Sequence, residues 1–103
     1  MGKLDRKYAR TIVTEALAIH SNFKQSELLG KHTVLLSTLG LDDIAQRKIS
    51  ENIVLHLGSQ HYLAFQAQKS AHVRLNQAIS DGEISIDGLV TIVSELTDSG
   101  GPD

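Results

Sequence analysis

The sequence predicts an all-α protein, a compact bundle of four or five helices. Three observations lead to this prediction. Pro102 is the only proline, so no proline interrupts the rest of the chain. Alanine, leucine, isoleucine, glutamine and glutamate are plentiful, whereas aromatic residues make up only 4% of the chain, and this composition favours helices over strands. Apolar residues also recur at steps of three and four, the spacing of one helical face.

The first expected helix spans about residues 4–22. Its apolar positions trace one face through Leu4, Tyr8, Ile12, Ala16, Ile19 and Phe23. A second helix is expected to start near Ser26, a suitable N-cap residue, and to end at Leu39. Gly30 inside this helix costs up to about 1 kcal/mol relative to alanine. Gly40 suits the left-handed position that follows a helix C-terminus, so the chain is expected to leave the helix there.

A third helix is expected to begin at Asp42 and Asp43, which supply an N-cap and an acidic first turn, and to end at Gly58. Its last turns are apolar on more than one face, at Ile53, Val54, Leu55 and Leu57. A segment of this kind either lies at the centre of a core or is shared between a core and an interface.

Residues 60–80 are expected to form a fourth helix that ends in a turn at residues 80–83. Ser85 then caps a short fifth helix with an apolar stripe at Ile86, Leu89, Val90, Val93 and Leu96. These elements predict a single helical domain over residues 1–97 and a mobile tail over residues 98–103. The expected core consists of Ile12, Ala16, Ile19, Phe23, Leu35, Leu39, Ile49, Ile53, Leu57, Phe65, Leu75, Leu89, Val93 and Leu96.

Charge is distributed unevenly along the chain. Residues 1–74 hold all 10 Lys and Arg residues and six acidic residues, which gives this part a net charge of +4. Residues 75–103 hold six acidic residues and no Lys or Arg, which gives a net charge of −6. This asymmetry indicates electrostatic complementarity within the fold or between chains, or two solvated faces of different charge.

A basic cluster opens the first expected helix, at Lys3, Arg6, Lys7 and Arg10. Positive charge at this end opposes the helix dipole by a few tenths of a kcal/mol per residue, and a phosphate or an acidic partner would reverse that penalty. The cluster is therefore a candidate partner-binding site, and the alternative is a solubilising amino-terminal segment. A helix-turn-helix reading of the second and third helices is disfavoured, because Asp42 and Asp43 would begin the recognition helix and would be repelled by phosphates.

The chain contains no recognisable catalytic or metal-binding motif. The absence of cysteine excludes a disulfide scaffold, a zinc ribbon and a thiol nucleophile. Residues 81–85 match the middle of a calcium-binding loop, but Gln77, Ile79 and Gly88 would then occupy the positions of three acidic ligands. No two of the five histidines are three or four residues apart, and neither a nucleophile elbow nor a phosphate-binding loop is present. We therefore expect a protein that is not an enzyme and needs no cofactor and no metal.

The leading hypothesis is a small regulatory protein that acts by binding another protein. It would serve as an antagonist or adaptor of a bacterial or phage transcription or signalling protein. The alternative is a DNA- or RNA-binding regulator that uses the basic cluster. A cytoplasmic location and no membrane association are expected, because no apolar run approaches the ~20 residues of a membrane span and the charged start precedes no signal-peptide core.

A homodimer is also expected. Each helix needs one apolar stripe to join a single core, and the second and third helices carry a surplus. The residues assigned to self-association are Val34, Leu36, Val54 and Leu55. In the alternative, the third helix lies in the middle of the bundle and has neighbours on all sides.

Overall fold

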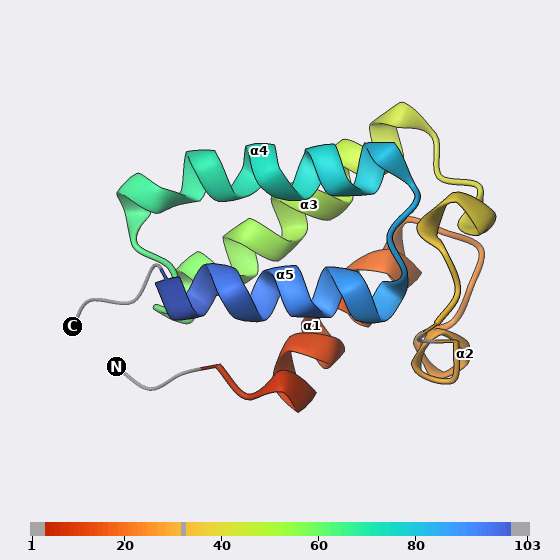
Figure 1. Ribbon diagram of the computed structural model, residues 1–103, viewed down its shortest axis with the longest axis horizontal. Helices are drawn as coiled ribbons and strands as arrows, with labels where there is room; N and C mark the ends of the chain where they lie inside the picture. Colours follow the sequence, from red (N-terminus) through yellow and green to blue (C-terminus); the bar gives the residue numbers. More distant parts are fainter. Residues whose placement is uncertain (1–3, 32, 100–103) are drawn as a thin grey trace.

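The computed structural model describes residues 4–31 and 33–99. This part of the chain confirms the predicted all-α class. Its elements are α1 (Arg6–Ile19), α2 (Gln25–Leu29), the 3₁₀ helix η1 (Leu36–Leu39), α3 (Asp43–Ser59), α4 (Phe65–Asp81) and α5 (Ile86–Ser99). α4 and α5 lie side by side at the front of the bundle, with α3 behind them and α1 below (Figure 1).

α1 begins after Asp5, whose side chain accepts a hydrogen bond from the backbone N–H of Lys7. Its buried apolar residues are Ala9, Ile12, Val13, Ala16 and Leu17. Ile19 was expected in the core, but this prediction is wrong: the residue lies in the last turn, to one side of the buried face, and is exposed.

The expected continuous helix from Ser26 to Leu39 is not formed. α2 ends at Leu29, and η1 begins only at Leu36. At the start of η1 the chain pairs with the segment before α5: the backbone N–H of Leu36 donates to the carbonyl of Ile84 at 2.8 Å, and the N–H of Ile86 donates to the carbonyl of Val34. Neighbours in extended backbone point to opposite sides, which explains why Leu36 is buried and Leu35, predicted for the core, is exposed.

Gly40 adopts the predicted left-handed conformation, with φ of 68°. α3 then starts as expected, since the Asp42 carboxylate accepts a hydrogen bond from the N–H of Ala45 at 2.8 Å. The expected end at Gly58 is one residue early. The side chain of Gln68 from α4 lies over Gly58, and a Cβ atom at this position would be 2.5 Å from its Nε2 atom.

His61 takes the left-handed position after α3, with φ of 64°. The N–H of Tyr62 donates to the carbonyl of Leu57, and the N–H of His61 donates to the carbonyl of Gly58. These two hydrogen bonds form a Schellman motif, which ends the helix without a glycine at the left-handed residue.

α4 begins at Phe65, five residues later than expected, because residues 60–64 complete the reversal between the helices. Phe65 was predicted for the core, but as the first residue of α4 it points into solvent. The turn predicted at residues 80–83 begins two residues later, because α4 continues through Asp81, and the predicted Ser85 cap is present. Gly82 has φ of 72°, and the Ser85 hydroxyl accepts a hydrogen bond from the N–H of Gly88 at 3.0 Å.

The core draws side chains from every helix. α5 contributes four fully buried side chains, Ile86, Leu89, Val90 and Val93. α5 continues to Ser99, so the first two residues of the predicted tail are helical, while residues 100–103 lie outside the described part of the chain. The remaining core residues include Ile12, Leu17, Leu28, Ile49, Ile53, Leu57, Leu75 and Ile79.

Candidate functional site

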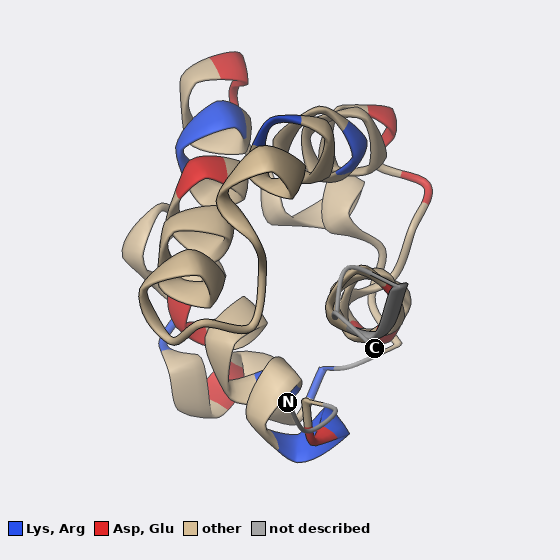
Figure 2. Ribbon diagram, turned by 90° about the vertical axis from the view of Figure 1, so that its left-hand side faces the viewer, with Lys and Arg blue, Asp and Glu red and all other residues tan. Residues whose placement is uncertain are grey.

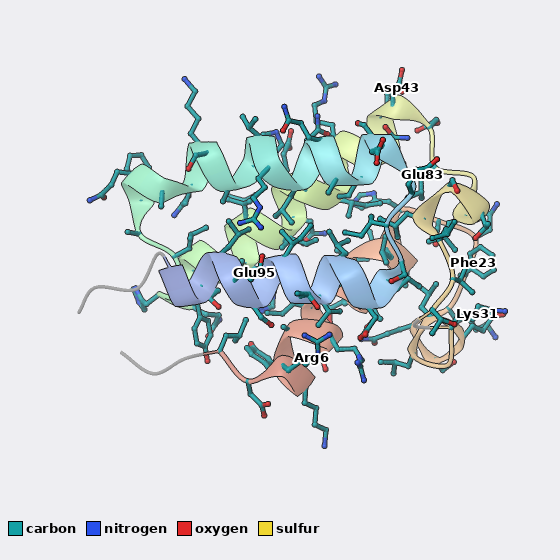
Figure 3. The ribbon with its side chains drawn as sticks, in the orientation of Figure 1. Arg6, Phe23, Lys31, Asp43, Glu83 and Glu95 are labelled. Carbon is teal, nitrogen blue, oxygen red and sulfur yellow. The ribbon has the colours of Figure 1, made fainter. Side chains whose placement is uncertain are left out.

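Two arginines of the predicted basic cluster contact α5. The Nη2 atom of Arg10 lies 2.7 Å from Oδ1 of Asp87, and the Nη2 atom of Arg6 lies 3.2 Å from the same oxygen. Arg6 also donates a hydrogen bond to the hydroxyl of Thr91 at 2.9 Å. The side chain of Arg6 lies on the side of α1 that faces α5 (Figure 3). The basic and acidic parts of the sequence are therefore complementary within the fold at this point.

These contacts hold the pKa of Asp87 below its ordinary value. The hydrogen bond from Arg10 is the largest cause, and the hydrogen bond from Arg6 and the positive charges of both arginines act in the same direction. Desolvation acts against them. A second ion pair, between Arg74 on α4 and Glu95 on α5, joins the two parts of the sequence again at 2.7 Å.

The rest of the basic cluster is not drawn into this contact. Lys7 is exposed at the start of α1, and Lys3 lies outside the described residues. The structure thus brings Arg6 and Arg10 together on one carboxylate and leaves Lys7 in solvent. Binding of a partner by the four residues stays a prediction, and such a partner would have to share or replace the Asp87 carboxylate.

The four residues predicted for self-association do not form one exposed surface. Leu36 and Val54 are 1% and 5% exposed, and Val34 is half-buried. For Leu36 and Val54 this corrects the expected surface position, because both pack in the core of their own chain. Val54 is one turn after Ser50, which contacts α4, so this side of α3 is covered. Leu55 is 66% exposed.

Most of the exposed large apolar side chains lie on α3 and α4. Phe65 is 85% exposed, and Ile44 is 57% exposed. By contrast, no large apolar side chain of α5 is exposed within the described residues. The full set of exposed apolar side chains is Ile19, Leu29, Leu35, Ile44, Leu55, Phe65 and Val73.

The outer face of α3 carries a regular pattern that we name the α3 stripe. It consists of Ile44, Lys48, Glu51 and Leu55, all exposed. The helix buries Ile49, Ile53 and Leu57 on its opposite face. An open pocket of about 300 Å³ lies beside the stripe and is lined by His20, Lys48, Glu51, Asn52 and Leu55.

A second open pocket, also of about 300 Å³, lies between the start of α3 and the end of α4. Its lining is polar apart from Ile44 and includes Arg47 and Asn76. Next to it, the hydroxyl of Ser80 donates a hydrogen bond to the side chain of Gln46.

Two histidines make contacts that sequence reasoning missed. The Nδ1 atom of His72 lies 2.9 Å from the hydroxyl of buried Ser50, and the Nε2 atom of His56 lies 3.2 Å from the hydroxyl of Tyr8. Both pairs join residues more than twenty positions apart, so no local spacing signals them. Among the described residues, no group of three or more His, Cys, Asp or Glu side chains could hold a metal ion, and no helix is long and apolar enough to cross a membrane.

Comparison of the chain with protein-family models, with curated proteins and with solved structures found no match. The surfaces described above are therefore the basis on which a function is proposed.

Proposed function

We propose that this protein is a small non-enzymatic regulator that acts by binding another protein. The observation that carries the proposal is the exposure of Phe65, whose side chain is 85% accessible to solvent. Burying an aromatic side chain of this size contributes about 1.5–3 kcal/mol, which the isolated chain does not gain. Aromatic side chains are enriched at the centres of protein interfaces, where a few residues carry most of the binding free energy.

The surroundings of Phe65 define the kind of surface a partner would need. Lys69 and Val73 follow at steps of four on the same broad face of α4, and both are exposed. A partner with an apolar pocket for Phe65 and a carboxylate near Lys69 would match this face. Within this proposal, the specific role is that of an adaptor or antagonist of a transcription or signalling protein.

Site-specific photo-crosslinking tests the proposal. A photo-reactive phenylalanine analogue replaces Phe65 in one variant and Gln77, an exposed residue of the same helix, in a control variant. Both are used in cells of the source organism. A partner should be captured at position 65 and not at position 77, and it is then purified for binding measurements.

With the purified partner, Phe65→Ser should raise the Kd at least ~30-fold, as expected for an interface hot spot. Gln77→Ser should leave it unchanged, and the melting temperatures of both variants should match that of the wild type. Equal capture at both positions, or an unchanged Kd for Phe65→Ser, would contradict the proposal. Tight binding of duplex DNA at ~50 mM salt, lost steeply as salt is raised, would replace it with the nucleic-acid alternative.

A further inference from the structure

The α3 stripe has the same chemical pattern in both directions. From residue 44 to residue 55 it is apolar, charged, charged and apolar, and the central charges are of opposite sign. Two copies of such a stripe complement each other when the helices lie antiparallel. We propose that the α3 stripe is the surface through which two copies of this chain associate, about a two-fold axis that passes between residues 49 and 50.

The spacing of the stripe fits helix-on-helix packing. Its four residues follow one another at steps of four, three and four, the spacing of the inward positions of two packed helices. In the antiparallel arrangement, Ile44 of one copy faces Leu55 of the second copy. Lys48 of one copy faces Glu51 of the second copy. The two-fold axis repeats each contact, so the interface has two apolar pairs and two ion pairs.

Charge complementarity favours a second copy of this chain as the partner of the α3 stripe. Lys48 and Glu51 are both exposed, and neither forms an ion pair with another described residue. A parallel arrangement would place Lys48 against Lys48 and Glu51 against Glu51, and both contacts would be repulsive. Antiparallel pairing makes both contacts attractive, so the stripe defines the orientation of its partner as well as its chemistry.

The fold leaves this face of α3 uncovered. One side of the helix contacts α4 through the hydrogen bond between Ser50 and His72, and another contacts α1 through the hydrogen bond between His56 and Tyr8. The stripe lies opposite the buried residues of α3. Viewed along the bundle, α3 lies on the left-hand side of the molecule, away from α5 (Figure 2).

The size of the stripe sets the expected affinity. Its ends are 11 residues apart, or about 16 Å along the helix axis. Stable interfaces bury about 800 Å² per partner, which is more than three turns of one helix supply. A reversible dimer with a Kd of the order of 10–100 µM is therefore expected, and monomer and dimer should coexist at ordinary laboratory concentrations.

The dimer and the proposed regulatory partner use different helices. Phe65, Lys69 and Val73 lie on α4 and form no part of the α3 stripe. The two proposals can therefore fail independently. Phe65→Ser, which tests the regulatory partner, should not change self-association.

Sedimentation equilibrium from ~5 to ~500 µM tests the dimer. The wild type should shift from 11.2 kDa towards twice that mass as its concentration rises. Lys48→Glu and Glu51→Lys should each weaken the dimer at least ~10-fold, because each places like charges opposite one another. An equimolar mixture of these two variants should restore association, since every charged contact between the two different chains is then attractive. Lys31→Glu, a charge reversal at an exposed lysine outside α3 and α4, is the matched control and should have no effect.

Leu55→Glu should also abolish the mass shift, and helical circular dichroism should show that the variant remains folded. The proposal is overturned if the wild type stays near 11.2 kDa throughout. It is equally overturned if a dimer forms but neither the charge reversals nor Leu55→Glu weakens it, because the interface would then lie elsewhere.

Discussion

The α1–α5 pair and the α3–α4 pair use their side chains in different ways. α5 buries its large apolar residues against its own chain, and Asp87 binds both Arg6 and Arg10. α3 and α4 also pack against each other, but they leave Ile44, Leu55, Phe65 and Val73 exposed. The two pairs have comparable lengths, yet the α3–α4 pair exposes four large apolar side chains and the α1–α5 pair exposes only Ile19 among the described residues.

This difference indicates a division of roles within a short chain. A chain of about 100 residues buries only a limited fraction of its surface, and an apolar residue left outside contributes little to stability. The α1–α5 pair places nearly all of its large apolar side chains in the core. The α3–α4 pair leaves four of them outside, and it is the part of the molecule where the proposed contacts with a second copy and with a partner lie.

The largest expected effect is the difference in lost stability between a substitution at a core leucine and the same substitution at a surface leucine. Leu89→Ala in α5 should lower the free energy of unfolding by about 2–5 kcal/mol, because the side chain is fully buried and its removal leaves a cavity. Leu55→Ala in α3 makes the same chemical change at an exposed site and should stay within about 0.5 kcal/mol. Urea unfolding at a concentration where the chain is monomeric measures both. Similar losses for the two variants would break the comparison.

The turn that leads into α5 should be the next most sensitive site. Gly82→Ala places a side chain on a residue with φ of 72°, and the new Cβ atom would lie 3.0 Å from the Cβ atom of Ser37. We expect a loss of about 2 kcal/mol, most of it from the left-handed backbone. Gly30→Ala is the control, because Gly30 has right-handed backbone and its nearest atom is 3.6 Å away. It should leave the stability unchanged or raise it slightly.

The turn between α3 and α4 should respond in the opposite direction. His61 occupies a left-handed position without being glycine or asparagine. His61→Gly should raise the free energy of unfolding by about 0.5–1 kcal/mol, since relief of backbone strain exceeds the added entropy of the unfolded chain. His61→Ala retains the strain and should give no gain. Thermal unfolding of the three proteins measures the effect, and equal gains from glycine and alanine would show that the side chain, not the backbone, is responsible.

Sequence reasoning predicted the helices whose signals are local. Steps of three and four indicated α1, and the Asp42 N-cap, the Gly40 conformation and the Ser85 cap were all read from neighbouring residues. It was wrong before η1, where the backbone groups of Val34, Leu36 and Ser37 form hydrogen bonds with a segment about 50 positions away. No local pattern records such a partner.

The candidate surface was predicted only in part, for a related reason. Val54 and Leu55 are adjacent and equally apolar, and the sequence placed both at an interface. Ser50 and His72 show which side of α3 faces α4, and that information separates the buried Val54 from the exposed Leu55. The α3 stripe becomes visible only when the covered sides of the helix are known.

The smallest expected effect concerns the ion pairs that join α1 to α5 at Asp87. The pKa of Asp87 in the folded chain lies below its ordinary value of about 3.9, chiefly because Arg10 donates a hydrogen bond to the carboxylate. The ionised carboxylate therefore stabilises the fold above pH ~4, and this contribution is lost as the pH falls through the folded-state pKa. Asp87→Asn removes it, so the wild type should melt at a slightly higher temperature than this variant at pH 7.

The gap between the two melting temperatures should narrow below pH ~4 and in 1 M salt, because the contact is partly exposed and screened. Glu83→Gln, an exposed change outside the contact, serves as the control. A gap that stays constant down to pH 2 would show that Asp87 acts through packing, and the contrast with the α3–α4 pair would then rest on apolar burial alone.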